Sequence, residues 1–192
     1  YWFKKFISPK LKKNNYLSIN DFYVKNIVKV YKKNNGKINI LSLGSGNCDL
    51  EFCLAEELFK SKIINFNFEC VDLNETMLSR AKSIIQHKKY SKHFSFKISD
   101  FNNLESYRSK YDIVIANMCL HHVLDLESLF AKIKIKLRND NSRFLTYDMI
   151  GRNGHMRWPE SLVEINKIWK KLPKKKKFNH YLNSYQTEFT NY

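Results

Sequence analysis

Glycines and polar side chains stand directly after the first two short apolar runs of this sequence. Leu43 closes the run KINILSL and is followed by Gly44, Ser45 and Gly46, which let the backbone turn tightly and approach a ligand closely. A helix that begins after such a loop offers free N–H groups to that ligand. Asp72 closes the second run, where a carboxylate can accept hydrogen bonds from the two hydroxyls of a ribose. Together these features favour a nucleoside-like ligand.

Further polar and aromatic residues follow the third and fourth apolar runs. Asp100 is an acceptor for an exocyclic amine, and the ring of the adjacent Phe101 can stack on a base. Asn117 follows the fourth run and precedes His121 and His122, whose imidazoles titrate in the range that suits base chemistry near neutrality. Each signal is weak alone, because a G-x-G pair is often only a tight turn. Their combination is much more specific.

These polar residues also have plainer interpretations. One of two adjacent histidines at the start of a helix is more often a packed or capping residue than a catalytic base. A lone aspartate at the end of a strand is often a helix cap, although Asn74 and Thr76 already serve that need after Asp72. Catalysis by His121 or His122 is therefore a hypothesis beside a structural alternative.

The elements that position these residues alternate between strands and helices. Runs with strand character cover residues 37–43, 66–73, 94–101, 111–118 and 142–149, and segments with helical spacing or capping signals cover residues 18–33, 49–60, 74–90 and 126–137. Such alternation predicts an α/β fold with a doubly wound, mostly parallel sheet and right-handed crossovers. Ligands bind at the carboxyl ends of the strands in such a sheet, which is where the polar residues stand.

The same segments resemble the class I S-adenosylmethionine-dependent methyltransferases, from about residue 37 to the end. ILSLGSGNCDLE is similar to their glycine-rich motif and ECVDLNETMLSRA to the segment with the ribose-binding acid. FKISDFNNL is similar to the adenine-contact segment, and YDIVIANMCLHHVLDLE to the fourth motif with its LHH signature. The resemblance implies a Rossmann-like methyltransferase fold, S-adenosyl-L-methionine as cofactor and methyl transfer as the reaction.

The resemblance also implies site residues. Gly44 and Gly46 would pass under the methionine part of the cofactor, and Asn117 would lie near the methyl group. The residues expected to contact the cofactor are Gly44, Ser45, Gly46, Asp72, Leu73, Asp100, Phe101 and Asn117. His121 and His122 are the candidates for a base that deprotonates the acceptor.

The stretch YDMIGRNGHMRWPESLVEINKIWKKLP resembles a branch of the family that often acts on small molecules or glycan precursors. It implies acceptor contacts from Tyr147, Asp148, His155 and Trp158, with turn chemistry and helix entry at Pro159 as the plainer alternative. Met118 and Cys119 stand where amino methyltransferases of adenine or glutamine have two prolines, and the Pro-Cys nucleophile of cytosine methylases is missing. We therefore expect a small-molecule or glycan-type acceptor.

Three features depart from the family pattern. Ser42 stands where an acid is common, Cys48 replaces the third glycine, and Glu51 could supply the missing carboxylate. The family sheet normally ends with two more strands, so we expect a truncated sheet and natural chain ends that lie elsewhere. The predicted organisation is an N-terminal helical extension over residues 1–36 and a methyltransferase domain over residues 37–192 whose C-terminal part is incomplete.

Composition leaves two further functions open. The 192 residues carry 34 Lys and Arg against 18 Asp and Glu, a formal net charge of +16. Lysine far outnumbers arginine, as AT-rich coding DNA produces, and lysine runs are commonly solvated faces. The alternative is an RNA-modifying methyltransferase in which the lysines at 174–177 contact phosphates. A non-catalytic nucleotide-binding scaffold is the third hypothesis, encouraged by Ser42 and Cys48.

Cysteine spacing and hydropathy limit the compartments and the cofactors that fit this sequence. The four cysteines show no paired C-x-x-C spacing, so neither a zinc site nor a disulfide framework is expected, and reduced thiols in the cytoplasm fit best. No run of about 18 apolar residues predicts a membrane span. We expect a small-molecule partner, do not favour nucleic acid, and make no prediction of oligomeric state.

Overall fold

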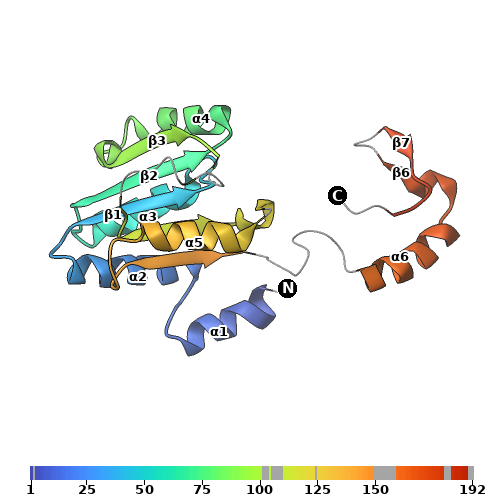
Figure 1. Ribbon diagram of the computed structural model, residues 1–192, viewed down its shortest axis with the longest axis horizontal. Helices are drawn as coiled ribbons and strands as arrows, with labels where there is room; N and C mark the ends of the chain where they lie inside the picture. Colours follow the sequence, from blue (N-terminus) through green and yellow to red (C-terminus); the bar gives the residue numbers. More distant parts are fainter. Residues whose placement is uncertain are drawn as a thin grey trace. The chain divides into compact units, whose positions relative to one another are not determined.

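The computed structural model describes residues 1, 3–100, 104, 110–123, 125–148, 159–179 and 183–189. They fall into two compact units, Tyr1–Asp148 and Met149–Tyr192, which are described separately below (Figure 1). The first unit contains the sheet and every described residue of the predicted site.

A five-stranded parallel sheet forms the centre of the first unit (Figure 1). Its strands are β1 (Ile38–Leu43), β2 (Phe66–Asp72), β3 (Phe94–Ile98), β4 (Ile113–Asn117) and β5 (Arg143–Tyr147). Their order is β3-β2-β1-β4-β5, so the chain winds outward from β1 in one direction and then returns to add β4 on its other side. This arrangement confirms the predicted doubly wound α/β fold, and its strand order reverses between β1 and β4, where such sheets bind ligands.

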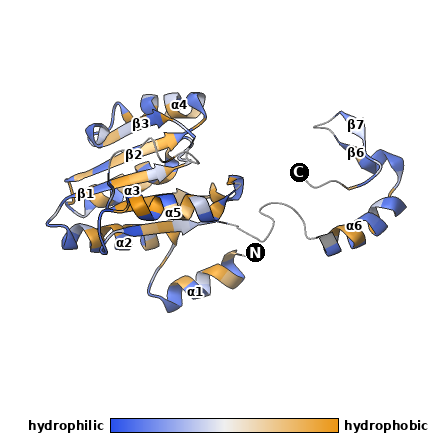
Figure 2. Cartoon of the chain, viewed as in Figure 1, coloured by the Kyte–Doolittle hydropathy of each residue, from blue (hydrophilic) through white to orange (hydrophobic). Residues whose placement is uncertain are grey.

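Two apolar clusters cover the two faces of the sheet because each central strand is buried on both sides. Ile38 and Ile40 face one cluster while Leu41 and Leu43 face the other, and all four are at most 1% exposed. Figure 2 shows hydrophobic residues in the strands and a mixture of hydrophobic and hydrophilic residues along the helices. Continuous apolar runs are typical of parallel strands buried on both faces, which is why these strands could be predicted from sequence.

Helices on both faces complete the unit. They are α2 (Ile19–Lys33), α3 (Asp49–Lys60), α4 (Glu75–Ile85) and α5 (Leu126–Lys136), with 3-10 turns at Ser91–His93 and Leu120–His122. A π-helix at Phe3–Ile7 and α1 (Ser8–Lys13) precede them and contribute no buried residue. Residues of α2, α3 and α4 pack into the first cluster, and α5 packs into the second. Asn74 caps α4 through its side-chain oxygen, which accepts from the backbone N–H of Met77, as one of the two predicted caps.

Several predicted elements are shorter in the structure than in the sequence interpretation, and two of them end early. The helix expected over residues 74–90 ends at Ile85, and the strand expected over residues 94–101 ends at Ile98. Beyond α4 the backbone N–H of Lys88 bonds to the carbonyl of Ile85, three residues back, so the helical i to i−4 ladder is replaced by tight turns. The apolar periodicity continues to the buried Tyr90 without a helix, which is why the end was placed too late.

Helix α2 is part of the core of the first unit. Tyr23, Ile27 and Val30 are at most 1% exposed and belong to the same cluster as β1 and β4. The predicted division into an N-terminal helical extension over residues 1–36 and a methyltransferase domain over residues 37–192 stays a prediction, and the compact unit that contains α2 runs from Tyr1 to Asp148. The segment before β1 therefore contributes directly to the face on which the site is built.

The second unit contains α6 (Pro159–Lys171), a 3-10 turn at Lys174–Lys177 and a short antiparallel pair, β6 (Phe178–Asn179) with β7 (Ser184–Tyr185). The indole N–H of Trp169 donates to the carbonyl of Gln186 at 3.3 Å, and the Trp169 and Phe189 rings meet edge to face. These contacts join the helix to the residues that follow it.

Among the residues that the structure describes, no helix is both long enough and apolar enough to cross a bilayer.

Candidate functional site

The loop between β1 and α3 has the backbone that the glycine-rich motif requires. Gly44 and Gly46 have φ values of 58° and 54°, in the left-handed region that favours glycine. Cys48, which replaces the third glycine, also has a left-handed φ of 60°, and Ser45 donates its backbone N–H to the carbonyl of Val71 at 3.0 Å. The loop thus keeps its turn despite the cysteine, at a cost of roughly 1–2 kcal/mol for the side chain.

Asp72 joins the end of β2 to this loop. One carboxylate oxygen accepts the backbone N–H of Gly46 and the other accepts the backbone N–H of Asn74, each at 2.8 Å. A carboxylate oxygen has two lone pairs, so each oxygen can accept one further hydrogen bond. Asp72 therefore shapes the loop and can still accept from the hydroxyls of a ribose.

Exposed apolar side chains surround these polar groups. Leu73, Met77, Ile98 and Met118 are between 37% and 61% exposed, and they stand at or just after the carboxyl ends of β2, β3 and β4. The Met77 sulfur lies 3.6 Å from the position that a Cβ on Gly46 would take, so this side chain borders the loop. Large apolar groups beside a few oriented polar groups are typical of ligand sites, and this set fits the apolar and ribose parts of an adenosine.

The predicted adenine contacts are only partly described. Asp100 lies exposed after β3, two residues beyond Ile98, which is paired with Asp72 in the sheet. Phe101 lies outside the described residues, as do the predicted acceptor contacts His155 and Trp158. Contact of Asp100 and Phe101 with adenine stays a prediction.

Asn117 is held by a residue that the sequence interpretation missed. The hydroxyl of Tyr23, a fully buried residue of α2, donates to the Asn117 side-chain oxygen at 3.2 Å. Burial raises the pKa of the Tyr23 hydroxyl above its ordinary value, with further contributions from the nearby Glu51 and Cys119 and an opposing hydrogen bond from the backbone of Tyr147. Tyr23 therefore remains a neutral donor at any physiological pH.

His121 and Asp148 form a hydrogen-bonded pair between the segments that follow β4 and β5. The Nδ1 atom of His121 lies 2.8 Å from one Asp148 oxygen, and the other oxygen accepts the backbone N–H of Leu120 at 2.7 Å. Their side chains are 9% and 1% exposed. His122 is exposed, and its ring centroid lies 4.2 Å from that of His121. Sequence reasoning named all three residues but did not foresee that Asp148 and His121 pair.

Glu51 lies beneath the glycine loop. Its carboxylate is 2% exposed and accepts the hydroxyl of Ser42 at 2.5 Å, so Glu51 places an acid beside the position where the family pattern often has one. Desolvation raises the pKa of Glu51 to about 7, while the Ser42 hydrogen bond opposes that shift. Glu51 therefore lies where it could supply the carboxylate that is missing at Ser42.

The cysteines carry no metal or disulfide chemistry in the described part of the chain. Cys48, Cys53, Cys70 and Cys119 are free thiols, and no group of three His, Cys, Asp or Glu side chains among the described residues could hold a metal ion. Cys119 donates its thiol to the carbonyl of Leu43 at 3.2 Å, and burial raises its pKa to about 12. It packs against the loop as a neutral thiol.

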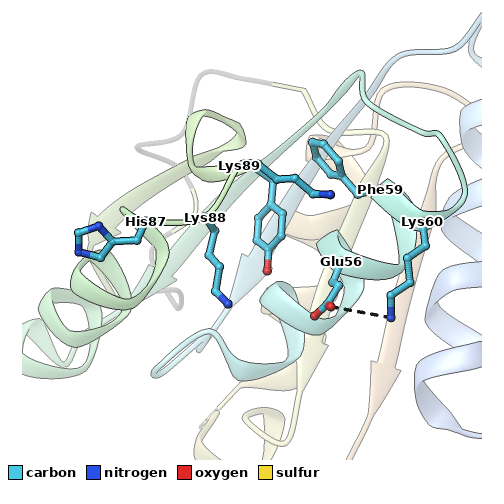
Figure 3. Close-up of a pocket in the computed structure, with 7 residues that line it drawn as sticks. Glu56, Phe59, Lys60, His87, Lys88 and Lys89 are labelled. Carbon is cyan, nitrogen blue, oxygen red and sulfur yellow. Dashed lines mark ion pairs between the residues drawn. The ribbon is translucent and has the colours of Figure 1, made fainter.

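A hollow of about 390 Å³ lies elsewhere on the first unit (Figure 3). It is lined by the end of α3 and by the residues after α4: Glu56, Phe59, Lys60, His87, Lys88, Lys89 and Tyr90. These residues directly precede β2 and β3, so the hollow lies at the amino ends of the strands, opposite the glycine loop. Its Lys60 is paired with Glu57 at 2.7 Å and with Glu56 at 3.8 Å. The hollow is therefore separate from the candidate site.

Comparison with known protein families identifies the family of this chain. Residues 33–190 match the model of a methyltransferase domain family. The chain belongs to this methyltransferase family. Membership confirms the resemblance to class I S-adenosylmethionine-dependent methyltransferases, and with it the class of enzyme and the cofactor that the resemblance implied.

Solved structures with the same fold are distant in sequence from this methyltransferase domain. The DszA carbon methyltransferase is 17% identical over 70% of this chain, with a TM-score of 0.58. The plantazolicin methyltransferase BpumL, solved with a pentazolic desmethylPZN analogue and SAH, is 17% identical over 77% of this chain, with a TM-score of 0.53. The CMeT domain of the citrinin polyketide synthase is 18% identical over 62%, also with a TM-score of 0.53.

The chain covers 36%, 55% and 30% of those three chains, so it spans about half of their length or less. No curated protein matches the sequence. At these identities the structural likeness shows the fold of the methyltransferase domain.

Proposed function

We propose that this chain transfers a methyl group from S-adenosylmethionine to a small-molecule or glycan-type acceptor. The observation that carries the proposal is the Asp72 carboxylate, which bonds to the backbone of the glycine loop at the end of β2 while keeping lone pairs for a ribose. Gly44, Gly46 and the exposed Leu73 lie at the same edge of the sheet. The polar groups of the glycine loop and Asp72, bordered by exposed apolar side chains, suit the cofactor of the family.

The residues present fit the cofactor as the resemblance implies. The glycine loop would lie under the methionine part, Asp72 would hold the ribose, and Asp100 and Phe101 would contact the adenine. The exposed apolar side chains beside them would add contacts to the adenosine. S-adenosylmethionine supplies an electrophilic methyl group when it is bound. The protein then needs only to align the acceptor atom with that methyl group and, where necessary, to remove a proton from it.

His121 is the better of the two candidates for that base. Asp148 accepts from Nδ1, which places the proton of the neutral ring on Nδ1 and leaves Nε2 as its basic nitrogen. A carboxylate behind the imidazole also stabilises the protonated ring that forms when the base accepts a proton. His122 lies exposed beside His121, with the two ring centroids 4.2 Å apart.

The acceptor class rests on residues and on structural relatives. The relatives named above include a carbon methyltransferase and a plantazolicin methyltransferase that was solved with a pentazolic desmethylPZN analogue and SAH. The lysines of the second unit give less support to an RNA substrate, because Lys174 lies 5.2 Å over the ring of Tyr185 and Lys177 donates to the carbonyl of Lys170.

We also propose a cytoplasmic location, since the four cysteines remain free thiols.

Calorimetric titration of the full-length protein tests the cofactor. We expect S-adenosylmethionine and S-adenosylhomocysteine to bind with dissociation constants in the micromolar range, which corresponds to about 8 kcal/mol of binding free energy. A folded protein that binds neither compound would exclude the proposed function and favour the scaffold. Binding of a short RNA that weakens steeply with added salt would favour the RNA-modifying alternative.

Replacement of His121 tests the base. We expect His121→Gln to lower the turnover number by about 10²- to 10⁴-fold, the usual contribution of a positioned base, while the affinity for S-adenosylhomocysteine changes little. The measurement is transfer of a labelled methyl group to an acceptor found by screening, over a range of pH. His122→Gln is the matched control, and a larger loss in that variant would assign the base to His122.

A further inference from the structure

The Asn117 side chain can present either its oxygen or its nitrogen to a ligand, and its neighbours decide which. The Asn117 oxygen accepts the hydroxyl of Tyr23 at 3.2 Å. The reverse orientation would turn the Asn117 N–H groups toward the Tyr23 oxygen and leave the hydroxyl proton without the acceptor that it has in the structure. A buried hydroxyl that loses its acceptor costs free energy, so the observed orientation is favoured.

The same contact leaves the Asn117 amide nitrogen available. Within the described residues no protein group accepts a hydrogen bond from this nitrogen, and it is not among the buried polar atoms that lack a partner. The nitrogen therefore has access to solvent or to a ligand. Asn117 is half-buried at the carboxyl end of β4, next to β1, at the point where the strand order reverses.

We propose that Tyr23 is a positioning residue that fixes the Asn117 amide with its two N–H groups directed to the ligand. This inference rests on the proposed function, because it assigns Asn117 to the methyl-transfer site. A ligand atom that meets Asn117 must then accept hydrogen bonds. An acceptor that presents an oxygen to this position fits, whereas the N–H groups of an amine would face donors.

Tyr23 reaches the candidate site from within the core. Its ring is fully buried beside β4, and the contact with Asn117 joins residues 94 positions apart in the sequence. No other described residue donates a side-chain hydrogen bond to Asn117. Loss of the Tyr23 hydroxyl alone should therefore free the amide to rotate.

The test compares Tyr23→Phe with the wild-type full-length protein, using S-adenosylhomocysteine as the probe. The side-chain amide of Asn117 is observed by ¹⁵N NMR, and the dissociation constant is measured by calorimetry. We expect the Asn117 amide signals of the wild-type protein to shift on titration with S-adenosylhomocysteine. In Tyr23→Phe the amide can rotate, so we expect its signals to be averaged over its orientations. We also expect affinity to fall about fivefold to tenfold in the variant, as one lost hydrogen bond predicts.

Two further variants separate this effect from a general loss of stability. Tyr111→Phe removes another buried tyrosine hydroxyl, which donates to Glu69 at 2.8 Å near the amino end of β4, and it should leave affinity unchanged. Asn117→Asp keeps an oxygen for Tyr23 but replaces the donor by an acceptor, so it should weaken binding at least as much as Tyr23→Phe.

The outcomes are distinct. If wild-type protein binds the probe and Tyr23→Phe binds it equally well with unchanged Asn117 signals, the positioning by Tyr23 is wrong while the proposed function stands. If the folded wild-type protein binds neither S-adenosylhomocysteine nor S-adenosylmethionine, both proposals fail together.

Discussion

Replacing Asp72 with alanine is expected to weaken the binding of S-adenosylhomocysteine by at least about a hundredfold. The variant loses both hydrogen bonds that hold the glycine loop and the start of α4, together with the proposed contact to the ribose. Hydrogen bonds to charged groups contribute about 1.5–3 kcal/mol each when buried, and the half-buried position of Asp72 places them near the lower end. Calorimetry on the full-length protein measures the effect.

Asp125→Ala is the matched control for this prediction. Asp125 also accepts a backbone N–H with its carboxylate, from Ser128 at 2.9 Å, and thereby caps α5. Its loss should cost about 1 kcal/mol of stability and leave affinity for the probe unchanged. Equal affinities for wild-type protein and Asp72→Ala would contradict the assignment of the cofactor site to this edge of the sheet.

Glu51→Gln is expected to stabilise the folded protein at pH 8 by up to about 3 kcal/mol. In the folded state desolvation raises the pKa of Glu51 to about 7, against 4.5 for an ordinary glutamate. The folded protein thus binds the proton more tightly than the unfolded chain, so stability falls as pH rises from about 4.5 to about 7 and is level above that. Glutamine avoids the buried charge and keeps an oxygen for the Ser42 hydroxyl.

Urea unfolding at several pH values measures this difference. The advantage of Glu51→Gln should be near zero at pH 4, grow through pH 7 and stay constant at higher pH. Glu57→Gln, which removes a surface charge paired with Lys60, should change stability by less than about 1 kcal/mol at any of these pH values. An advantage that does not vary with pH would show that Glu51 titrates as an ordinary glutamate.

Local signals were enough to predict the main elements of the first unit. The helix at Asp49–Lys60 was predicted with its observed bounds, because acidic residues begin it, lysine ends it and a glycine loop precedes it. The strands β1 and β4 were found because they are buried on both faces and therefore read as apolar runs, whereas the edge strand β3 was found from its alternating pattern. The end of α4 was misplaced, since no glycine, proline or asparagine marks it.

Long-range contacts of the candidate site could not be predicted from the sequence. Tyr23 stands in an amphipathic helix, where an aromatic residue predicts only packing, and its hydrogen-bond partner comes from a distant strand. The pairing of His121 with Asp148 likewise depends on β4 and β5 being neighbours. Sequence patterns named the polar residues at the strand ends, but the fold alone decides which of them meet.

The position of Asp148 has a consequence for the candidate site. It is the last residue of the first compact unit, and its carboxylate holds both the His121 imidazole and the backbone N–H of Leu120. The chain therefore leaves the first unit from the backbone of a residue whose side chain belongs to the candidate site. Loss of the Asp148 carboxylate would remove the hydrogen bonds to the His121 ring and to the backbone of Leu120 together.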